Sequence, residues 1–485
     1  MLQDRPNQPP HVAEKLLWLA CTVIAGAAIV ATLVYPFAKG VLIGIAPVLV
    51  GLGFAIASIT FSFDLTKLSR MLDCSPGKWM AGLCLSAAVI RLPLVVFPAR
   101  PVSDFLSYYE SAKALANGIG HLSVYYPPGQ PAWLSVWFVV FGDHLRLLVF
   151  AQCLLSLASI PMLYVALRPV NELGARMASA AIAFFPSIVL LSGTLAHETT
   201  QIFLLSVLLL VYRRAAESRG FVSLLYWASL GIVTGAIAMV RPTFLAIVPL
   251  IVVVELLRRQ SIALTALRAA VIVILMGAII APWSIRNYRI YNRFCLISAN
   301  AGINLLGVTH PKSNGIFYDV GNLGSNLNEV DRDKYFMQLA ISSIKADPWR
   351  IVRLGFKKII WMWGADSSMV EDVVGLSDSP LKRLLQAIDN TFWAWLVTVW
   401  FIGALVARPW QSRHPGTENL ICSWVLLLFL LHALFEPQAR HHVPVIPLIL
   451  GICGPSYLAL IVRRSEKAAL AGSIKSQLLV NPYAG

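Results

Sequence analysis

The sequence predicts an all-α membrane protein that crosses the bilayer about twelve times. Of its 485 residues, 58% are hydrophobic and only 13% are charged, roughly half the charged share of a soluble domain. The apolar residues form long continuous runs instead of alternating with polar ones, which favours helices over the strands of a barrel.

Each predicted span is an apolar window of a length suited to a membrane helix. The twelve windows cover residues 16–36, 40–60, 79–97, 145–167, 176–195, 198–212, 221–240, 242–257, 267–283, 391–407, 419–435 and 443–462. A second apolar run follows the first at once, so we expect a retained first helix and no cleaved signal peptide.

The basic residues fix the direction of the chain. With twelve spans and both termini in the cytoplasm, every basic connection falls on one side, as the positive-inside rule requires. This bias also accounts for the net charge of +15 without nucleic-acid binding. The basic residues are Lys67, Arg70, Lys78, Arg168, Arg176, Arg213, Arg214, Arg219, Arg258, Arg259, Arg268, Arg408, Arg413, Arg463, Arg464 and Lys467.

The chain divides into four predicted regions. Residues 1–78 hold two extra spans, and 79–283 form a core whose first long outer loop is 98–144. Residues 284–390 form a small mixed domain on the outer face, with an amphipathic surface helix over Asp347–Trp363. Residues 391–485 return to the membrane and end in the cytoplasm. No nucleotide-binding glycine pattern occurs, so energy for chemistry must arrive with the substrate.

The first long outer loop holds a candidate catalytic carboxylate. Asp104 begins a segment of helical spacing in which Phe105 and Tyr108 share one face. A first-turn carboxylate also suits the helix dipole, and this structural role can coexist with chemistry. The run Tyr125 to Pro131 follows, and its tyrosines fit either ligand contact or anchoring at the membrane surface.

Further polar residues lie at the outer ends of later spans. Glu198, preceded by His197, starts a short span, where a carboxylate facing the bundle is costly and so points to function; a capping glutamate in a wet turn is the alternative. The predicted cationic group for a phosphate is Arg440, His441, His442, Arg241 and Arg286. Ordinary contact with lipid headgroups is its alternative.

The order of these motifs resembles a known group of enzymes. An apolar span, an outer Asp before Tyr–Tyr–x–x–Ala–x–x–Leu–x–x–Gly, YYPPG, a short helix ending in FG and an Arg-bearing span (Arg146) occur in sequence. GTLAHETT, MVRPT, APWSIRNYRIYNRF and ISANAGINLLG follow. The pattern is similar to polyprenyl-phosphate-dependent C-type membrane glycosyltransferases, which include family 39 protein O-mannosyltransferases, the lipid A aminoarabinose transferase and rhizobial galacturonosyltransferase-like proteins. It covers roughly 79–462.

The resemblance implies a C-type glycosyltransferase fold and a role for each candidate residue. Asp104 would be the catalytic carboxylate, Glu198 with His197 a second acidic site in the same cavity, and the cationic group the holder of the donor phosphate. Tyr108, Tyr125, Tyr126, Asn300 and Asn304 would contact sugar or acceptor, although turn geometry alone explains the asparagines. A divalent cation shared by Asp104, His197 and Glu198 stays open.

One position departs from the family pattern. Relatives of the aminoarabinose transferase type carry a Lys before the Pro–Pro pair that touches the donor phosphate, and this chain has Tyr126 there. That contact must be missing or supplied elsewhere.

The expected function is transfer of a monosaccharide from a polyprenyl-phosphate carrier to a cell-envelope glycolipid, polysaccharide or protein. One base and a cationic phosphate site suffice for an inverting single displacement. The expected place is a bacterial inner membrane, with the active site on the periplasmic side. A transporter of lipid-linked glycans and an O-antigen-ligase-type enzyme are the alternatives; a transporter should show inverted repeats and broken helices. The interpretation requires Asp104 and the late cationic residues to converge.

Overall fold

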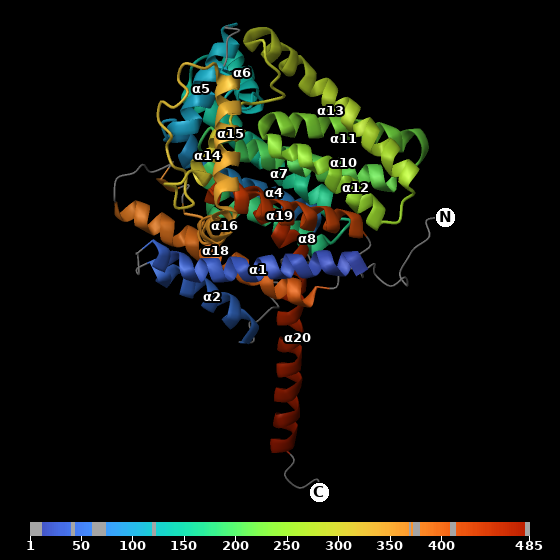
Figure 1. The fold of residues 1–485 in the computed structure, drawn as a ribbon. Helices are drawn as coiled ribbons and strands as arrows, with labels where there is room; N and C mark the ends of the chain where they lie inside the picture. Colours follow the sequence, from blue (N-terminus) through green and yellow to red (C-terminus); the bar gives the residue numbers. More distant parts are fainter. Residues whose placement is uncertain are drawn as a thin grey trace.

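The computed structural model describes residues 12–39, 44–60, 74–118, 123–367, 370–371, 379–407 and 414–480, and within these ranges every regular element is a helix (Figure 1). The first seven helices are α1 (Val12–Ala38), α2 (Ile45–Thr60), α4 (Pro76–Val96), α5 (Ser103–Ala116), α6 (Gly129–Phe141), α7 (Leu145–Leu167) and α8 (Glu172–Phe184). The next six are α9 (Pro186–Ser192), α10 (His197–Glu217), α11 (Gly220–Val240), η2 (Pro242–Ala246), α12 (Ile247–Leu257) and α13 (Ile262–Tyr291). The last seven are α14 (Ala301–Thr309), α15 (Glu329–Ala346), α16 (Pro348–Trp363), α18 (Pro380–Val406), α19 (Pro415–Leu434), η4 (Ala439–Val445) and α20 (Ile446–Val480).

The predicted class, an all-α protein with many membrane spans, is confirmed. Among the described residues, nine helices are long and apolar enough to cross a membrane, and the bent pair of α8 and α9 makes ten. These ten coincide with ten of the twelve predicted windows. The windows 40–60 and 242–257 instead form the shorter apolar helices Ile45–Thr60 and Pro242–Leu257.

The bend between α8 and α9 has a local cause in the sequence. The two helices meet at 54°, and the residue between them, Phe185, is extended, with φ −67° and ψ 124°. Proline disfavours helical geometry in the residue before it, so Pro186 interrupts the helix that the apolar run alone would continue.

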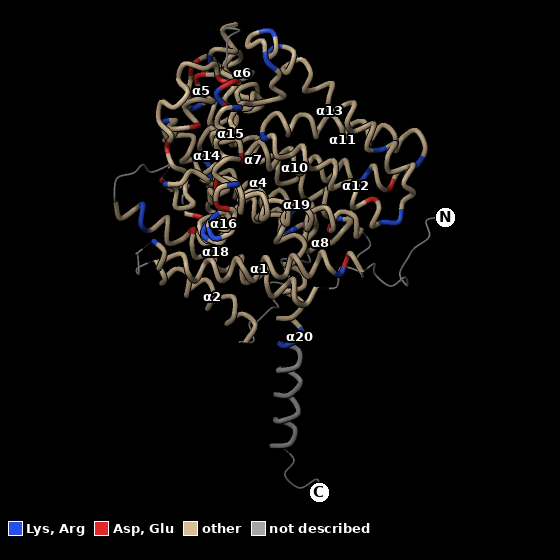
Figure 2. Tube along the Cα trace, viewed as in Figure 1, with Lys and Arg blue, Asp and Glu red and all other residues tan. Residues whose placement is uncertain are grey.

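The connections α10–α11 and α12–α13 carry basic residues and lie at one end of the long helices, called the basic end below, while Lys and Arg also occur at the other end of α13 and on α16 (Figure 2). Glu255 is fully buried there and accepts hydrogen bonds from Arg258 at 2.7 Å and Arg268 at 2.5 Å. Glu217 pairs with Arg213 at 2.8 Å and His414 at 3.1 Å. Arg258 Nη2 also donates to the Ala216 carbonyl at 3.4 Å. Together these contacts join the end of α10, the α12–α13 connection and the residue before α19 in space. Lys67, Arg70, Arg408 and Arg413 lie outside the described residues.

The opposite end of the bundle, called the site end below, carries α5, α6, α14 and α15 (Figure 1). The helices α14 and α15 share a small core of Leu305, Leu306, Phe336 and Ala340. They approach so closely that a Cβ on Gly302 would lie 2.0 Å from the Asp333 carbonyl oxygen. This close packing supplies a firm wall opposite α5.

The predicted amphipathic helix forms as α16, which packs against α1 and α19. Asp347 caps its start by accepting a hydrogen bond from the Arg350 amide at 2.8 Å. Trp363 is fully buried in the bundle, whereas Trp349 and Phe356 are 76% and 67% exposed. One face of α16 therefore closes the core, and the opposite face exposes apolar side chains together with Arg353 and Lys357.

Candidate active site

Asp104 lies in the first turn of α5, where it meets a residue from the far end of the chain. Its Oδ2 forms an ion pair with Arg440 of η4, 336 positions later in the sequence. Its Oδ1 accepts a hydrogen bond from the Tyr126 hydroxyl at 2.8 Å. The preceding Ser103 has φ +50°, an uncommon conformation for a residue other than glycine. The structure thus brings the early carboxylate and a late cation together.

Arg440 lies between two carboxylates. Besides Asp104, its Nε lies 3.7 Å from Glu198 Oε1 and donates to Gln438 Oε1 at 2.6 Å. Its guanidinium carbon lies 5.6 Å from the centre of the Phe105 ring. The Arg440 side chain is 12% exposed, so its charge is largely removed from water and is balanced by these acids.

Glu198 is the fully buried one of the two acids that flank Arg440. Its side chain has no exposed surface, and neither carboxylate oxygen has a hydrogen-bond partner. His197 Nδ1 lies 3.4 Å from Glu198 Oε2 and 3.5 Å from the Tyr108 hydroxyl. A buried carboxylate without hydrogen bonds is costly. Its main compensation is therefore electrostatic, from Arg440.

Two glutamines hold the turn that carries His197 and Glu198. Gln130 Nε2 donates to the Leu195 carbonyl at 3.0 Å, and Gln152 Nε2 donates to the Ala196 carbonyl at 2.6 Å. The Thr200 hydroxyl returns a 2.7 Å bond to Gln130 Oε1. These glutamines are not among the residues predicted from the sequence, although an amide inside an otherwise apolar helix is a usable signal.

The YYPPG segment positions Tyr126 beside Asp104. The Tyr126 ring packs edge-on against Tyr108 and Tyr125, with ring centres 5.3 and 4.7 Å apart. A Cβ on Gly129 would lie 2.6 Å from the Val240 amide nitrogen, so only glycine lets this segment rest on the end of α11. Tyr126, the residue before the Pro–Pro pair, donates to the carboxylate.

A second group of basic side chains lies next to η4. Arg241 Nη2 lies 3.3 Å from His432 Nε2, and the rings of His432 and His441 are 4.7 Å apart. His432 Nδ1 is bonded to the Leu428 carbonyl at 2.9 Å, whereas His441 Nδ1 is buried without a partner. Arg241 and His441 thus form a group with His432, which the sequence analysis did not select.

The structure engages His442 elsewhere. Its ring is fully buried, stacked 3.9 Å from Trp393, with Nδ1 2.7 Å from the Met362 carbonyl and Nε2 3.0 Å from Asp366 Oδ1. Because both nitrogens are occupied, this ring fastens η4 to the core. Its predicted phosphate contact has no support in this geometry.

Three other predicted residues do not contact Asp104. Arg286 stacks 4.5 Å from the Trp283 ring and donates to Asn287 at 2.9 Å. Asn300 Oδ1 accepts a hydrogen bond from the Ser298 hydroxyl at 3.1 Å. The backbone N–H of Asn304 donates to the Asn300 carbonyl in the first turn of α14. Both asparagines belong to the start of α14, next to the cavity described below.

The surroundings of Asp104 set its protonation. Burial raises its pKa, but the Arg440 guanidinium and the Tyr126 hydroxyl lower it more, so the pKa lies below its usual range. Among the described residues there is no group of three His, Cys, Asp or Glu side chains arranged to hold a metal ion. Asp104 is turned to Arg440 instead of sharing a site with His197 and Glu198, so these residues do not fit a shared cation.

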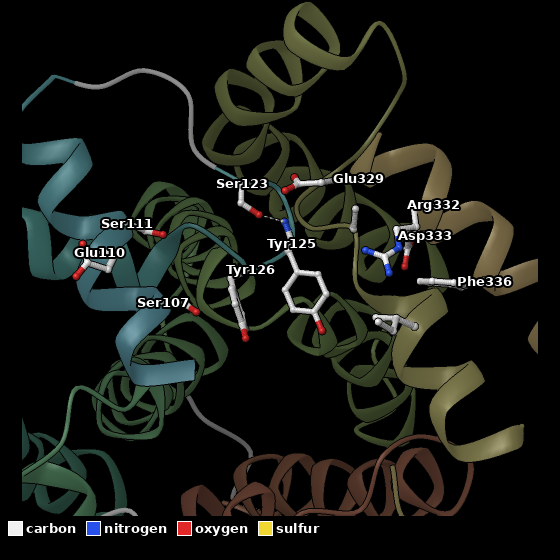
Figure 3. Close-up of a pocket in the computed structure, with 12 residues that line it drawn as sticks. Ser107, Glu110, Ser111, Ser123, Tyr125, Tyr126, Glu329, Arg332, Asp333 and Phe336 are labelled. Atoms are coloured by element: carbon white, nitrogen blue, oxygen red, sulfur yellow. Dashed lines mark hydrogen bonds between the residues drawn. The ribbon is translucent and has the colours of Figure 1, made fainter. Parts of the chain in front are cut away.

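A cavity opens beside Tyr126 (Figure 3). It measures about 430 Å³ and is bounded by α5 on one side and by α15 with the start of α14 on the other. Tyr125 and Tyr126 stand between these walls. The cavity therefore reaches the hydrogen-bonding partner of Asp104.

Comparisons with known proteins give a likeness of fold. No family model and no curated protein matches the chain. The apo oligosaccharyltransferase of Archaeoglobus fulgidus is similar at 15% identity with a TM-score of 0.49, over 81% of this chain and 52% of that one. ArnT from Cupriavidus metallidurans bound to undecaprenyl phosphate gives 16% identity and 0.42, over 81% and 77%. The S. cerevisiae Pmt1–Pmt2 protein O-mannosyltransferase bound to its sugar donor gives 15% and 0.38, over 56% and 39%.

The chain spans about half the length of the archaeal enzyme. At these identities and TM-scores the likenesses carry no argument, and what the protein does is inferred from its own residues.

Proposed function

We propose that the protein is a membrane glycosyltransferase that moves a monosaccharide from a polyprenyl-phosphate carrier to a hydroxyl of a cell-envelope acceptor. The observation that carries this proposal is the ion pair of Asp104 and Arg440, with Glu198 behind it. A positioned carboxylate suits the removal of a hydroxyl proton, and a guanidinium suits a phosphate. The pair supplies both groups at one point.

The proposed reaction is a single displacement. The acceptor hydroxyl gives its proton to Asp104 as its oxygen bonds to the anomeric carbon of the sugar. The bond from that carbon to the phosphate oxygen breaks, and its electron pair leaves with the phosphate. The products are a glycosylated acceptor with inverted configuration and the polyprenyl phosphate.

Donor binding would also activate the base. Without donor, Arg440 is committed to Asp104 and lowers the pKa of that carboxyl. A phosphate that draws the guanidinium to itself removes this effect, while the burial that raises the pKa remains. Asp104 then becomes a stronger base only when a sugar donor is in place. Glu198, 3.7 Å from the Arg440 Nε, would keep the guanidinium near both partners.

The location of the basic end supports an active site on the periplasmic side of a bacterial inner membrane. The helix α10 has 21 residues, or about 31 Å at 1.5 Å per residue. Glu198 lies in its first turn, at the site, and Arg213 and Glu217 lie near its other end, at the basic end. Under the positive-inside rule the basic end and both termini face the cytoplasm. The acceptor class is then an envelope glycolipid such as lipopolysaccharide, a polysaccharide or a protein.

The test uses the purified full chain in sealed vesicles with a labelled polyprenyl-phosphate hexose and envelope extract as acceptor. We expect the label to move to an acceptor while unlabelled polyprenyl phosphate appears in equal amount. Mass analysis of envelope glycolipids from cells with and without the gene then identifies the acceptor. Passage of the intact labelled lipid across the vesicle membrane without product would overturn the proposal in favour of a transporter.

A further inference from the structure

We infer that the cavity between α5 and α15 binds a carbohydrate portion of the acceptor and prefers neutral or amine-bearing sugars to acidic ones. This inference rests on the proposed function and narrows its acceptor class. The cavity, about 430 Å³ in volume, falls within the range of roughly 300–1,000 Å³ seen for small-molecule sites. It is large enough for a short segment of a glycan.

The position of the cavity connects it to the chemistry. Tyr126 is part of its wall and donates a 2.8 Å hydrogen bond to Asp104. Ser107, one turn after Asp104 on α5, is also part of the wall. A ligand that fills the cavity therefore lies against the residues that surround the proposed base.

The lining suits rings that carry hydroxyl groups. Tyr125 and Tyr126 present aromatic rings in the middle of the cavity, and Ser107, Ser111 and Ser123 add hydroxyls around them (Figure 3). Burial raises the pKa of Tyr125 to about 12, so its hydroxyl stays protonated as a donor. Sugars offer apolar C–H faces and polar edges, which match an aromatic face with hydrogen-bonding neighbours.

The charge of the lining is negative. Glu110, Glu329 and Asp333 line the cavity with a single guanidinium, that of Arg332. Arg332 is committed to its own wall, because its Nε donates to the Leu323 carbonyl and its Nη2 to the Gly321 carbonyl, both at 3.0 Å. The carbonyl groups carry no net charge, so the lining holds three carboxylates against one cation.

The carboxylates are fixed in place by the surrounding fold. Glu329 Oε2 accepts from the Val124 amide and the Tyr291 hydroxyl, both at 2.7 Å, and Asp333 Oδ1 accepts from the Gly302 amide at 2.7 Å. These carboxylates repel an anionic group placed inside the cavity, so binding of a phosphate or a uronic acid is disfavoured. Neither Arg440 nor Arg241 lines this cavity, which separates it from the site proposed for the donor phosphate.

The test measures glycan binding without requiring turnover. The full chain in lipid nanodiscs is titrated by saturation-transfer NMR with maltotriose, a glucosamine trisaccharide and a galacturonic acid trisaccharide. We expect the first two to bind and the third to bind worst. Tyr125→Ala should weaken binding about three- to tenfold, as loss of an aromatic contact predicts. Tyr125→Phe, which keeps the ring, should weaken it less.

Glu110→Gln tests the charge, because Glu110 is an exposed residue of α5 in the cavity wall. It should reduce the discrimination against the galacturonic acid trisaccharide by about two- to fivefold. Matched controls are Asp319→Asn, on an exposed turn outside the lining, and Tyr288→Ala, 54% exposed on α13. Both should bind like the unmodified protein.

Several results would overturn the inference. These are a preference for the acidic trisaccharide, unchanged binding in Tyr125→Ala, or no binding of any trisaccharide. Binding of tetralysine, a cationic peptide, without binding of the glycans would also overturn it. The two proposals fail separately. Glycan binding by a chain that never transfers sugar would overturn the proposed function alone, and transfer without glycan binding would overturn the cavity assignment alone.

Discussion

Replacement of Asp104 by Asn separates the proposed base from a structural role. Asparagine keeps the shape of the side chain and its hydrogen bond from Tyr126, but it cannot take a proton at neutral pH. Loss of a general base lowers turnover about 10²- to 10⁴-fold. A merely structural residue would lower turnover and donor binding together.

For Asp104→Asn the structure predicts tighter donor binding together with the lower turnover. Asp104 competes with the donor phosphate for Arg440, and an ion pair near 4 Å is worth about 4 kcal/mol at an effective dielectric constant of 20. The side chains are 24% and 12% exposed, so solvent screening reduces this value. If about 1.4 kcal/mol of the competition remains, donor affinity rises about tenfold in Asp104→Asn.

The assay pairs two measurements on the same nanodisc preparation. Titration with a polyprenyl-phosphate hexose gives the dissociation constant, and release of polyprenyl phosphate gives turnover. Asp143→Asn is the matched control, because Asp143 pairs with Lys113 at 2.6 Å on the surface, with side chains 43% and 42% exposed. Turnover of Asp104→Asn within threefold of the unmodified protein would refute the base assignment. A loss of donor binding in parallel with turnover would refute the competition for Arg440.

Three further perturbations test the surroundings. The lowered pKa of Asp104 predicts that turnover at subsaturating donor is lost only at a pH below the usual range of an aspartate pKa. Arg440→Gln should move this acid limit upward, because burial, which raises the pKa, then acts without the guanidinium. An unchanged pH profile would contradict the pairing. Gln152→Leu leaves the Ala196 carbonyl without its 2.6 Å donor and should cost about 1–3 kcal/mol, seen as a lower unfolding temperature together with lower turnover. Gly129→Ala places a Cβ 2.6 Å from the backbone of α11 and should lower the free energy of unfolding by about 1–3 kcal/mol. In the control Gly82→Ala the new Cβ has no atom within 4 Å, so the unfolding temperature should not fall. Equal unfolding temperatures of the two variants would refute the close approach.

The sequence predicts what depends on local hydropathy and chain order. Ten spans follow from apolar length, and the helix of Asp104 follows from its periodicity. Asp104 and Arg440 could be selected because both stand next to span ends on one face of the predicted topology. Their actual contact depends on the packing of the whole bundle, which no local pattern specifies.

The differences arise where geometry, and not composition, decides. Arg440, His441 and His442 are consecutive and were predicted as one phosphate site, yet they reach Asp104, His432 and Asp366 respectively. They lie in η4, a 3₁₀ helix, in which three residues complete a turn and successive side chains point about 120° apart. An interrupted helix of this kind is hard to recognise from sequence, so the divergence could not be predicted.

The position of Arg440 also agrees with the movement of charge in the proposed transfer. At the start, Asp104 is negative and the phosphate diester of the donor carries one charge. At the end, Asp104 has gained a proton and the leaving phosphate carries one charge more, so a negative charge has passed from the carboxylate to the phosphate. In the proposed reaction the bound donor has already drawn the Arg440 guanidinium from Asp104 to the phosphate, while Glu198, 3.7 Å from its Nε, holds it in the site. The cation is then in place at the group that gains the charge before the reaction begins, which is the condition for effective electrostatic stabilisation of a transition state.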